Sequence, residues 1–298
     1  MRGRAQIRIL PDGRRLYLHD GPIDIVLGAF GAAKQIEIAY RAAAQRFVSV
    51  LDELCEELPA LRIPAGPRAP EVTGPVAQRM AAAVTPYAKR WFITPMAAVA
   101  GAVAEEILAA MTSAAKLERA YVNDGGDIAL HIHQGHFVAG MIDKPEGGSL
   151  FGSAVLEAGQ PVRGIATSGW RGRSFSLGIA DAVTVLADRA AMADAAATII
   201  ANAVDLHGHP SIVRIAALDL APDSDLGDRL VTQAVGTLTT LEVSRALDAG
   251  EGIASELLSQ GLIRAAALHL QGETRMVGGP LVLKNSEAIS SERGFVHA

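Results

Sequence analysis

Asp194 and Thr198 are the two residues whose types and spacing best suit metal chemistry. They lie in the run AAMADAAATIIANA (190–203), which predicts a helix, and a separation of four residues places them on one helical face. A carboxylate and a hydroxyl are hard oxygen ligands of the kind that Mg²⁺ and Ca²⁺ accept. Taken alone, the pair also fits an ordinary acid near a helix start and a threonine that simply packs.

A glycine pair provides a second candidate position. Gly125 and Gly126 can adopt positive φ, which lets a ligand approach the backbone closely. The alternative is a tight loop before a strand. Asp127, directly after the pair, fits either a binding turn or a residue that ties down its own turn by side-chain hydrogen bonds.

Hydroxyl and carboxyl groups follow two further predicted strands. Thr167 and Ser168, next to Gly169, are expected to donate hydrogen bonds to a phosphate or a ring carbonyl. A nucleophilic serine is disfavoured because the segment lacks the Gly-x-Ser-x-Gly elbow. Asp181 stands between two predicted strands, where it either shapes a bend or, as the family resemblance below implies, is the catalytic residue, as a base or a metal ligand.

These segments, in this order, resemble the ApbE-type flavin transferases. YVNDGGDI (121–128) matches the family's Asn-x-Gly-Gly-Asp turn through Asn123, Thr-Ser-Gly at 167–169 matches a second segment, and VTVLADRAAMADAAAT (183–198) matches the strand and metal-binding helix. The resemblance implies a T-fold-like α+β architecture of mixed and antiparallel sheets packed with Ala-rich helices. It also implies Mg²⁺ at Asp194 and Thr198, FAD or FMN as the ligand, and transfer of FMN to a Ser or Thr of an acceptor protein.

The chain departs from the family at two places. ITPMAAVAG (93–101) stands where the family has Lys-Gly-Tyr, and no acid follows until Glu105. We expect Thr94 to be the N-cap of that helix and count it among the cofactor-binding residues. The family's His-x-Ile-x-Asp-Pro loop is reduced to GIAD (178–181). The alternatives are therefore chemistry on another phosphate-containing substrate, a non-catalytic flavin or nucleotide-binding protein, or a structural subunit.

Composition excludes several classes of partner. The chain has 298 residues, a net charge of −5 and no cluster of Lys or Arg, which argues against a nucleic-acid surface. No run approaches the ~18 apolar residues that a membrane span needs. One cysteine, Cys55, cannot form an internal disulfide. We expect a cytoplasmic protein, plausibly a homodimer. The histidines at 131, 133 and 136 suggest either a zinc site or a solvated hairpin.

Periodicity predicts an α+β domain over 1–280 and a polar tail over 281–298. Apolar positions spaced by three or four predict a long helix over 36–58, and small residues predict closely packed helices over 95–111 and 190–203. We expect hairpins over 6–19, over 119–142 around Gln134-Gly135, and over 263–277. A strand at 183–186 and helices over 226–247 and 253–258 complete the expected elements.

Overall fold

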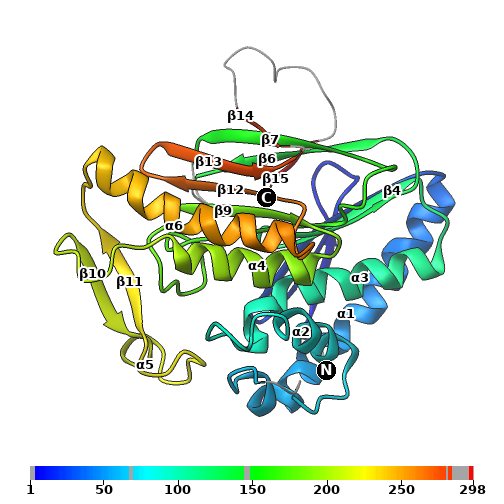
Figure 1. Ribbon diagram of the computed structural model, residues 1–298. Helices are drawn as coiled ribbons and strands as arrows, with labels where there is room; N and C mark the ends of the chain where they lie inside the picture. The colour runs from blue at the N-terminus through cyan, green and yellow to red at the C-terminus, as the bar shows by residue number, and fades with distance from the viewer. Residues whose placement is uncertain (1–3, 67–69, 144–147, 280, 284–294, 298) are drawn as a thin grey trace. The chain divides into compact units, whose positions relative to one another are not determined.

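The computed structural model describes residues 4–66, 70–143, 148–279, 281–283 and 295–297 (Figure 1). Contacts divide the chain into two compact units. Unit 1 comprises residues 1–136, 157–165 and 188–194, and unit 2 comprises residues 137–156, 166–187 and 195–298. Helices and mostly antiparallel strands occur in both units, which confirms the predicted α+β class. The assignment of residues 1–280 to one domain stays a prediction.

Unit 1 combines an antiparallel sheet with three long helices. Its elements are β1 (Gln6–Ile9), β2 (Leu16–Asp20), β3 (Ile23–Phe30), α1 (Ala33–Leu61), α2 (Pro75–Val84), the 3-10 helix η1 (Pro95–Ala98), α3 (Val99–Ala114), β4 (Arg119–Asp124) and β5 (Asp127–Ile132). The strands pair in chain order from β1 to β5, and β5 then pairs with the first residues of β8 (Gly164–Ser168).

The long helix α1 confirms the prediction from apolar spacing. Ala43, Phe47, Val50 and Leu54 are buried along one face, and α1 packs on α3. Pro59 lies inside the last turn rather than ending the helix.

The glycine pair makes the turn between β4 and β5. Gly125 and Gly126 have φ of 65° and 115°, which glycine adopts without the strain that a side chain imposes. The predicted hairpin around Gln134-Gly135 is wrong: β4 pairs with β5, whereas β6 (His136–Ile142) belongs to another sheet. The two-residue glycine turn closes the hairpin nine residues before the predicted turn at Gln134-Gly135.

The start of α3 differs from the predicted helix start. Pro95–Ala98 form a 3-10 turn, and Thr94, although extended, makes no capping hydrogen bond with its side chain. Thr94 is thus the N-cap residue, as predicted, although its side chain does not make the capping hydrogen bond. The prediction of close packing is confirmed, since a Cβ at Gly101 would lie 2.5 Å from the Ala190 carbonyl oxygen. No larger residue fits where α3 meets the start of α4 (Ala190–Ala203).

Unit 2 contains the remaining strands, residues 195–203 of α4, and the helices α5 and α6. Its elements are β6, β7 (Leu150–Glu157), the end of β8, β9 (Ala182–Ala187), β10 (Ile212–Ala216), α5 (Ala217–Leu220), β11 (Leu230–Val235), α6 (Thr240–Ser259), β12 (Ala265–Leu270), β13 (Glu273–Gly278), β14 (Leu281–Leu283) and β15 (Phe295–His297). The strand β9 and the hairpin of β12 and β13 confirm two predictions. Figure 1 shows α6 lying along β12 and β13.

The two helices predicted over 226–247 and 253–258 are wrong. Residues 230–235 form strand β11, and a single helix, α6, begins at Thr240. Thr239 and Glu242 form a capping box there, each side chain bonding the other residue's backbone N–H. This local signal fixes where α6 starts.

The predicted polar tail contributes two strands. Leu281–Leu283 pair with β7, and Phe295–His297 pair in parallel with β6. Residues 284–294 of this tail lie outside the described residues.

One helical stretch, Pro95–Ala114, is long and apolar enough to cross a membrane by length and composition. Glu105 and Glu106 in its middle form ion pairs with arginines of unit 1. Together with its buried face, these pairs are typical of a core helix.

Candidate functional site

Asp194 and Glu105 cap each other's helices. Oδ2 of Asp194, on α4, accepts a hydrogen bond of 3.0 Å from the Gly101 N–H in the first turn of α3. In return, Oε1 of Glu105, on α3, accepts one of 2.9 Å from the Ala191 N–H at the start of α4. Each carboxylate satisfies an amide that has no partner within its own helix and meets the positive end of the helix dipole. The Asp194 carboxylate is therefore held firmly in place.

The Asp194 carboxylate has an unusual affinity for protons. Burial raises its pKa from 3.8 to about 7, and the nearby Asp124 carboxylate adds to this effect, while the amides of Gly101 and Ala100 oppose it. The residue as a whole is nevertheless only partly buried. Near neutral pH, a divalent cation would compete with this proton for the same oxygens.

Thr198 has a hydroxyl that is available to a ligand. It is partly exposed on α4, one turn after Asp194, and its hydroxyl makes no hydrogen bond within the part of the chain that the structure describes. One carboxylate and one hydroxyl suit Mg²⁺, which usually keeps several waters and binds through one or two carboxylates together with substrate phosphates. No group of three or more His, Cys, Asp or Glu side chains suited to a metal occurs among the described residues. The residues present fit a cation that also uses a ligand's oxygens.

Asp124 is a second carboxylate that sequence reasoning missed. It ends β4, is 6% exposed, and accepts a hydrogen bond of 3.3 Å from the Asp24 N–H. Its position directly before the two glycines was the signal that could have identified it. Asn123, by contrast, accepts a hydrogen bond of 2.8 Å from the Gly126 N–H and so ties down the turn.

The remaining predicted residues of unit 1, Asp127 and Thr94, differ in exposure. Asp127 is partly exposed at the start of β5, opposite Asp124 in the strand register. Thr94 is 2% exposed, just before η1. The structure thus presents the turn to solvent and buries Thr94. Their binding roles stay predictions.

Asp181, in unit 2, is held by three donors. Oδ1 accepts hydrogen bonds from Trp170 Nε1 (3.1 Å) and Arg171 Nε (2.6 Å), and Oδ2 accepts one from the Gln271 N–H (2.7 Å). The residue is 9% exposed. These contacts fasten the loop after β8 to the end of β12. They favour the bend-shaping alternative, and the catalytic role stays a prediction.

The Thr-Ser-Gly segment is also built into unit 2. The Thr167 hydroxyl lies 2.9 Å from the Thr184 hydroxyl on β9, and Ser168 is partly exposed at the end of β8. A Cβ at Gly169 would lie 2.5 Å from the Asp181 carbonyl oxygen, so this position requires glycine. Binding by these three residues stays a prediction.

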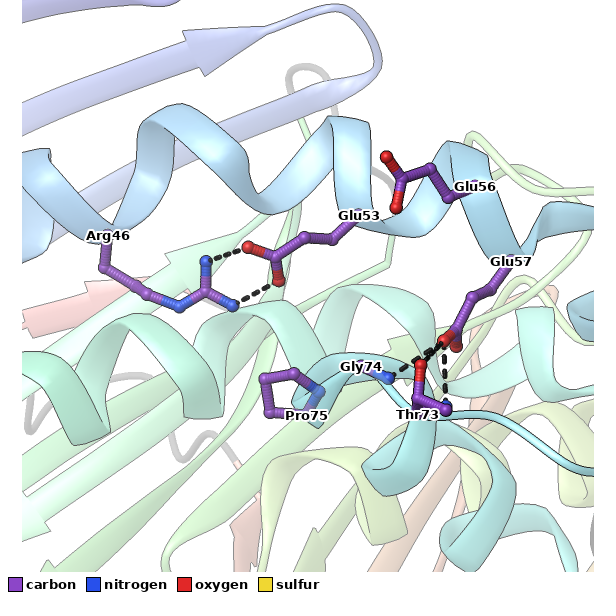
Figure 2. A pocket seen from close by; sticks show the side chains of 7 residues that line it. All are labelled: Arg46, Glu53, Glu56, Glu57, Thr73, Gly74 and Pro75. Atoms are coloured by element: carbon purple, nitrogen blue, oxygen red, sulfur yellow. Dashed lines mark hydrogen bonds and ion pairs between the residues drawn. The ribbon is translucent and has the colours of Figure 1, made fainter.

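A hollow in unit 1 is lined by none of the predicted site residues. It measures about 520 Å³ and is lined by Arg46, Glu53, Glu56, Glu57, Thr73, Gly74 and Pro75 (Figure 2). Arg46 binds both oxygens of Glu53, and Oε1 of Glu57 accepts hydrogen bonds from the amides of Thr73 and Gly74 and from the Thr73 hydroxyl. These contacts join α1 to the segment before α2, which is a structural role.

The zinc alternative for the three histidines gains no support. His131 Nε2 lies 3.2 Å from the Leu117 carbonyl oxygen, so this ring nitrogen already contacts the backbone. His133 and His136 are exposed.

Comparisons with known proteins identify the family. A model of the family described as AbpE bacteria matches residues 7–276. The chain is 42% identical to a UPF0280 protein of Methanopyrus kandleri over 130 residues, which are 43% of this chain and 48% of that protein. It is 38% identical to a UPF0280 protein of Methanothermobacter thermautotrophicus over 136 residues, 44% of this chain and 50% of that protein. The chain spans about half the length of these curated relatives.

A comparison with solved structures gives a more distant likeness. The match to the apo form of the flavinyl transferase ApbE of Pseudomonas stutzeri covers 94% of this chain and 93% of the other chain. The sequence identity is 12% and the TM-score is 0.43. The family assignment depends on the family model instead. Because that match runs through nearly the whole chain, the protein belongs to the AbpE bacteria family, a divergent ApbE-like family.

Proposed function

We propose that the protein binds the phosphate groups of a flavin or another nucleotide through a divalent cation held by Asp194 and Thr198. The observation that carries this proposal is the Asp194 carboxylate, which is fixed by the Gly101 amide, partly exposed, and raised in pKa to about 7. A hydroxyl without a hydrogen bond among the described residues lies one turn away on the same helix. The resemblance of segments 121–128, 167–169 and 183–198 to the ApbE-type flavin transferases adds flavin-phosphate chemistry as the context.

If the protein transfers FMN, the hydroxyl oxygen of an acceptor attacks the FMN phosphorus of FAD. The phosphorus–oxygen bond to AMP breaks, AMP leaves with the electron pair, and the hydroxyl proton passes to a base. Mg²⁺ would stabilise the charge that develops on the phosphate oxygens. The residues of this chain would orient the cation: the Gly101 amide holds Asp194, and the crossing of Gly101 over Ala190 fixes α4 relative to α3. Asp181 is the candidate base, and its three donors would first have to release an oxygen.

A second candidate function is binding without catalysis. Residues 93–101 replace the family's Lys-Gly-Tyr motif. In this segment Thr94 is only 2% exposed, and the 3-10 turn that follows it consists of apolar residues. The segment therefore presents little polar surface to a dinucleotide. In this alternative the protein holds FMN, FAD or another nucleotide and passes it on.

The first test is thermal denaturation with FAD, FMN or ATP, each with Mg²⁺ or with EDTA. The proposal expects a Mg²⁺-dependent rise in Tm that is absent in Asp194→Ala and Asp194→Asn. Asp194→Asn is the matched control for folding, since its amide oxygen can still accept the Gly101 hydrogen bond. A rise that persists in either variant would overturn the cation site.

The second test separates transfer from binding. The wild-type protein is incubated with FAD, Mg²⁺ and Ser- or Thr-containing acceptor peptides, and released AMP is measured by chromatography. Release of AMP that requires Asp194 supports transfer. Tight, Mg²⁺-dependent binding without AMP supports the binding alternative.

A further inference from the structure

A second hollow in unit 1 is lined by arginines. It measures about 250 Å³, and Arg79, Arg163 and Arg189 line it together with Glu105, Asp188 and residues of α3 and β5. We call it the arginine groove. Its volume is below the roughly 300–1,000 Å³ of pockets for drug-sized ligands, so it suits a single small group rather than a whole dinucleotide.

Two of the arginines keep N–H donors that are not engaged. Arg189 binds Oε2 of Glu105 through Nε (3.1 Å) and Nη2 (2.6 Å), and its Nη1 has no partner within the described residues. Arg79 binds the Pro75 carbonyl and Glu106 through Nη1 and lies near Glu105 through Nε, and its Nη2 likewise has no partner in the described part of the chain. Arg79 and Arg189, which both pair with Oε2 of Glu105, thus each keep one guanidinium nitrogen without a partner among the described residues.

The third arginine contributes charge rather than donors. Arg163 donates through Nη1 to the carbonyls of Gln160 and Val162 (2.6 Å each), and through Nη2 to that of Ala158 (2.8 Å) and more distantly to that of Ile132 (3.5 Å). Carbonyl oxygens carry no net charge. Among the described residues no carboxylate binds Arg163, so its positive charge is not neutralised by an ion pair.

The acids of the groove do not cancel this charge. Glu105 already uses Oε1 to accept from the Ala191 amide and Oε2 to bind Arg189. The lining carries three arginines against Glu105 and Asp188, a net formal charge of +1.

We propose that the arginine groove binds a phosphate group. Guanidinium groups with free donors recognise phosphate oxygens geometrically as well as by charge. Glu105 lies one helical turn after Gly101 on α3, so the groove is adjacent to Asp194 but uses different residues. The proposal does not depend on the cation site.

The test measures the binding of inorganic phosphate by isothermal titration calorimetry, with EDTA present and ionic strength held constant with sodium chloride. Thr112→Glu places a negative charge in the groove on the partly exposed face of α3. Ser113→Glu places the same charge on the next, exposed residue, which does not line the groove, and is the matched control. We expect Thr112→Glu to weaken phosphate binding about fivefold or more, and Ser113→Glu to change it less than twofold.

Further variants and a competing ligand decide the proposal. Arg189→Gln should weaken phosphate binding by a similar factor, while Asp194→Asn should leave it unchanged, which separates this site from the proposed cation site. Equal effects of the two glutamates, or no heat from phosphate beyond that from chloride, would overturn the proposal. AMP that competes with phosphate and binds more tightly identifies an organic phosphate as the ligand, and AMP that fails to do so identifies the free anion.

Discussion

Two aspartates that looked alike in the sequence have opposite surroundings in the structure. Asp181, in unit 2, accepts three hydrogen bonds and has an arginine beside it, so its negative charge is compensated by its own neighbours. Asp194, in unit 1, accepts from backbone amides and has another carboxylate, Asp124, nearby. The neighbours of Asp181 stabilise its negative charge. The negative charge of Asp194 needs a proton or a cation to compensate it.

This difference indicates how to separate structural from functional acids. A carboxylate whose partners are complete contributes to stability, and its removal leaves buried donors without acceptors. A carboxylate that is fixed in position but not neutralised is suited to bind an exogenous cation. The following experiments can break or sharpen that distinction.

The largest effect is expected from Asp194→Ala, which removes both the charge and the cap of α3. We predict a complete loss of the Mg²⁺-dependent stabilisation by nucleotides, together with a loss of about 1 kcal/mol in the free energy of unfolding of the ligand-free protein. Asp194→Asn should lose the Mg²⁺ dependence while keeping most of the stability. Urea denaturation and thermal shift measure the two quantities, and a Mg²⁺ effect that survives in either variant contradicts the functional assignment.

Asp181→Ala is expected to lower the free energy of unfolding by roughly 2–4 kcal/mol, because it leaves the Trp170 and Gln271 N–H groups and the Arg171 charge without their acceptor. The Mg²⁺-dependent shift should persist at temperatures where the variant is folded. Asp248→Ala, at an exposed acid on α6, is the control and should change stability little. Loss of the Mg²⁺ effect with unchanged stability would instead make Asp181 functional.

The stability of the metal-free protein should fall as pH rises from about 5 to about 7. The folded-state pKa of Asp194 is raised to about 7, so the native protein keeps a proton that the unfolded chain has already released above about pH 4. This group contributes a slope of up to about 1.4 kcal/mol per pH unit. Urea denaturation in EDTA across this range measures the slope, and the difference between wild type and Asp194→Asn isolates the contribution of this carboxylate. Equal slopes would show that Asp194 has an ordinary pKa.

The smallest effect is expected from Thr198→Val, which removes a hydroxyl at nearly constant volume. We predict Mg²⁺ binding about fivefold weaker, equivalent to about 1 kcal/mol, with little change in stability because no described residue depends on that hydroxyl. Thr85→Val is the control, since its hydroxyl bonds the Ala81 carbonyl of its own helix. Titration of Mg²⁺ in the presence of FAD measures both variants. A larger effect in the control would contradict the role of Thr198.

The sequence predicted elements whose signals are local. Apolar spacing identified α1, and small residues identified the close packing at Gly101. The start of α6 was also readable from the Thr239 and Glu242 capping box, and the error there came from weighting apolar spacing above capping chemistry.

The candidate site could be predicted only in part, because its decisive contacts join distant residues. Asp194 and Gly101 are 93 positions apart, and the Asp181 oxygen that binds Gln271 reaches across 90. Spacing on α4 indicated that Asp194 and Thr198 share a face. It could not indicate that Asp194 caps another helix, that Asp124 approaches it, or that Asp181 has its acceptor capacity filled.

The boundary between the two units runs through β8 and α4, and this affects how the molecule can be divided. An N-terminal fragment that ends at residue 136 would lack the strand that borders β5 and the acid that caps α3. Neither unit can therefore be produced intact as a single uninterrupted polypeptide, and proteolytic cleavage within either shared element would damage both.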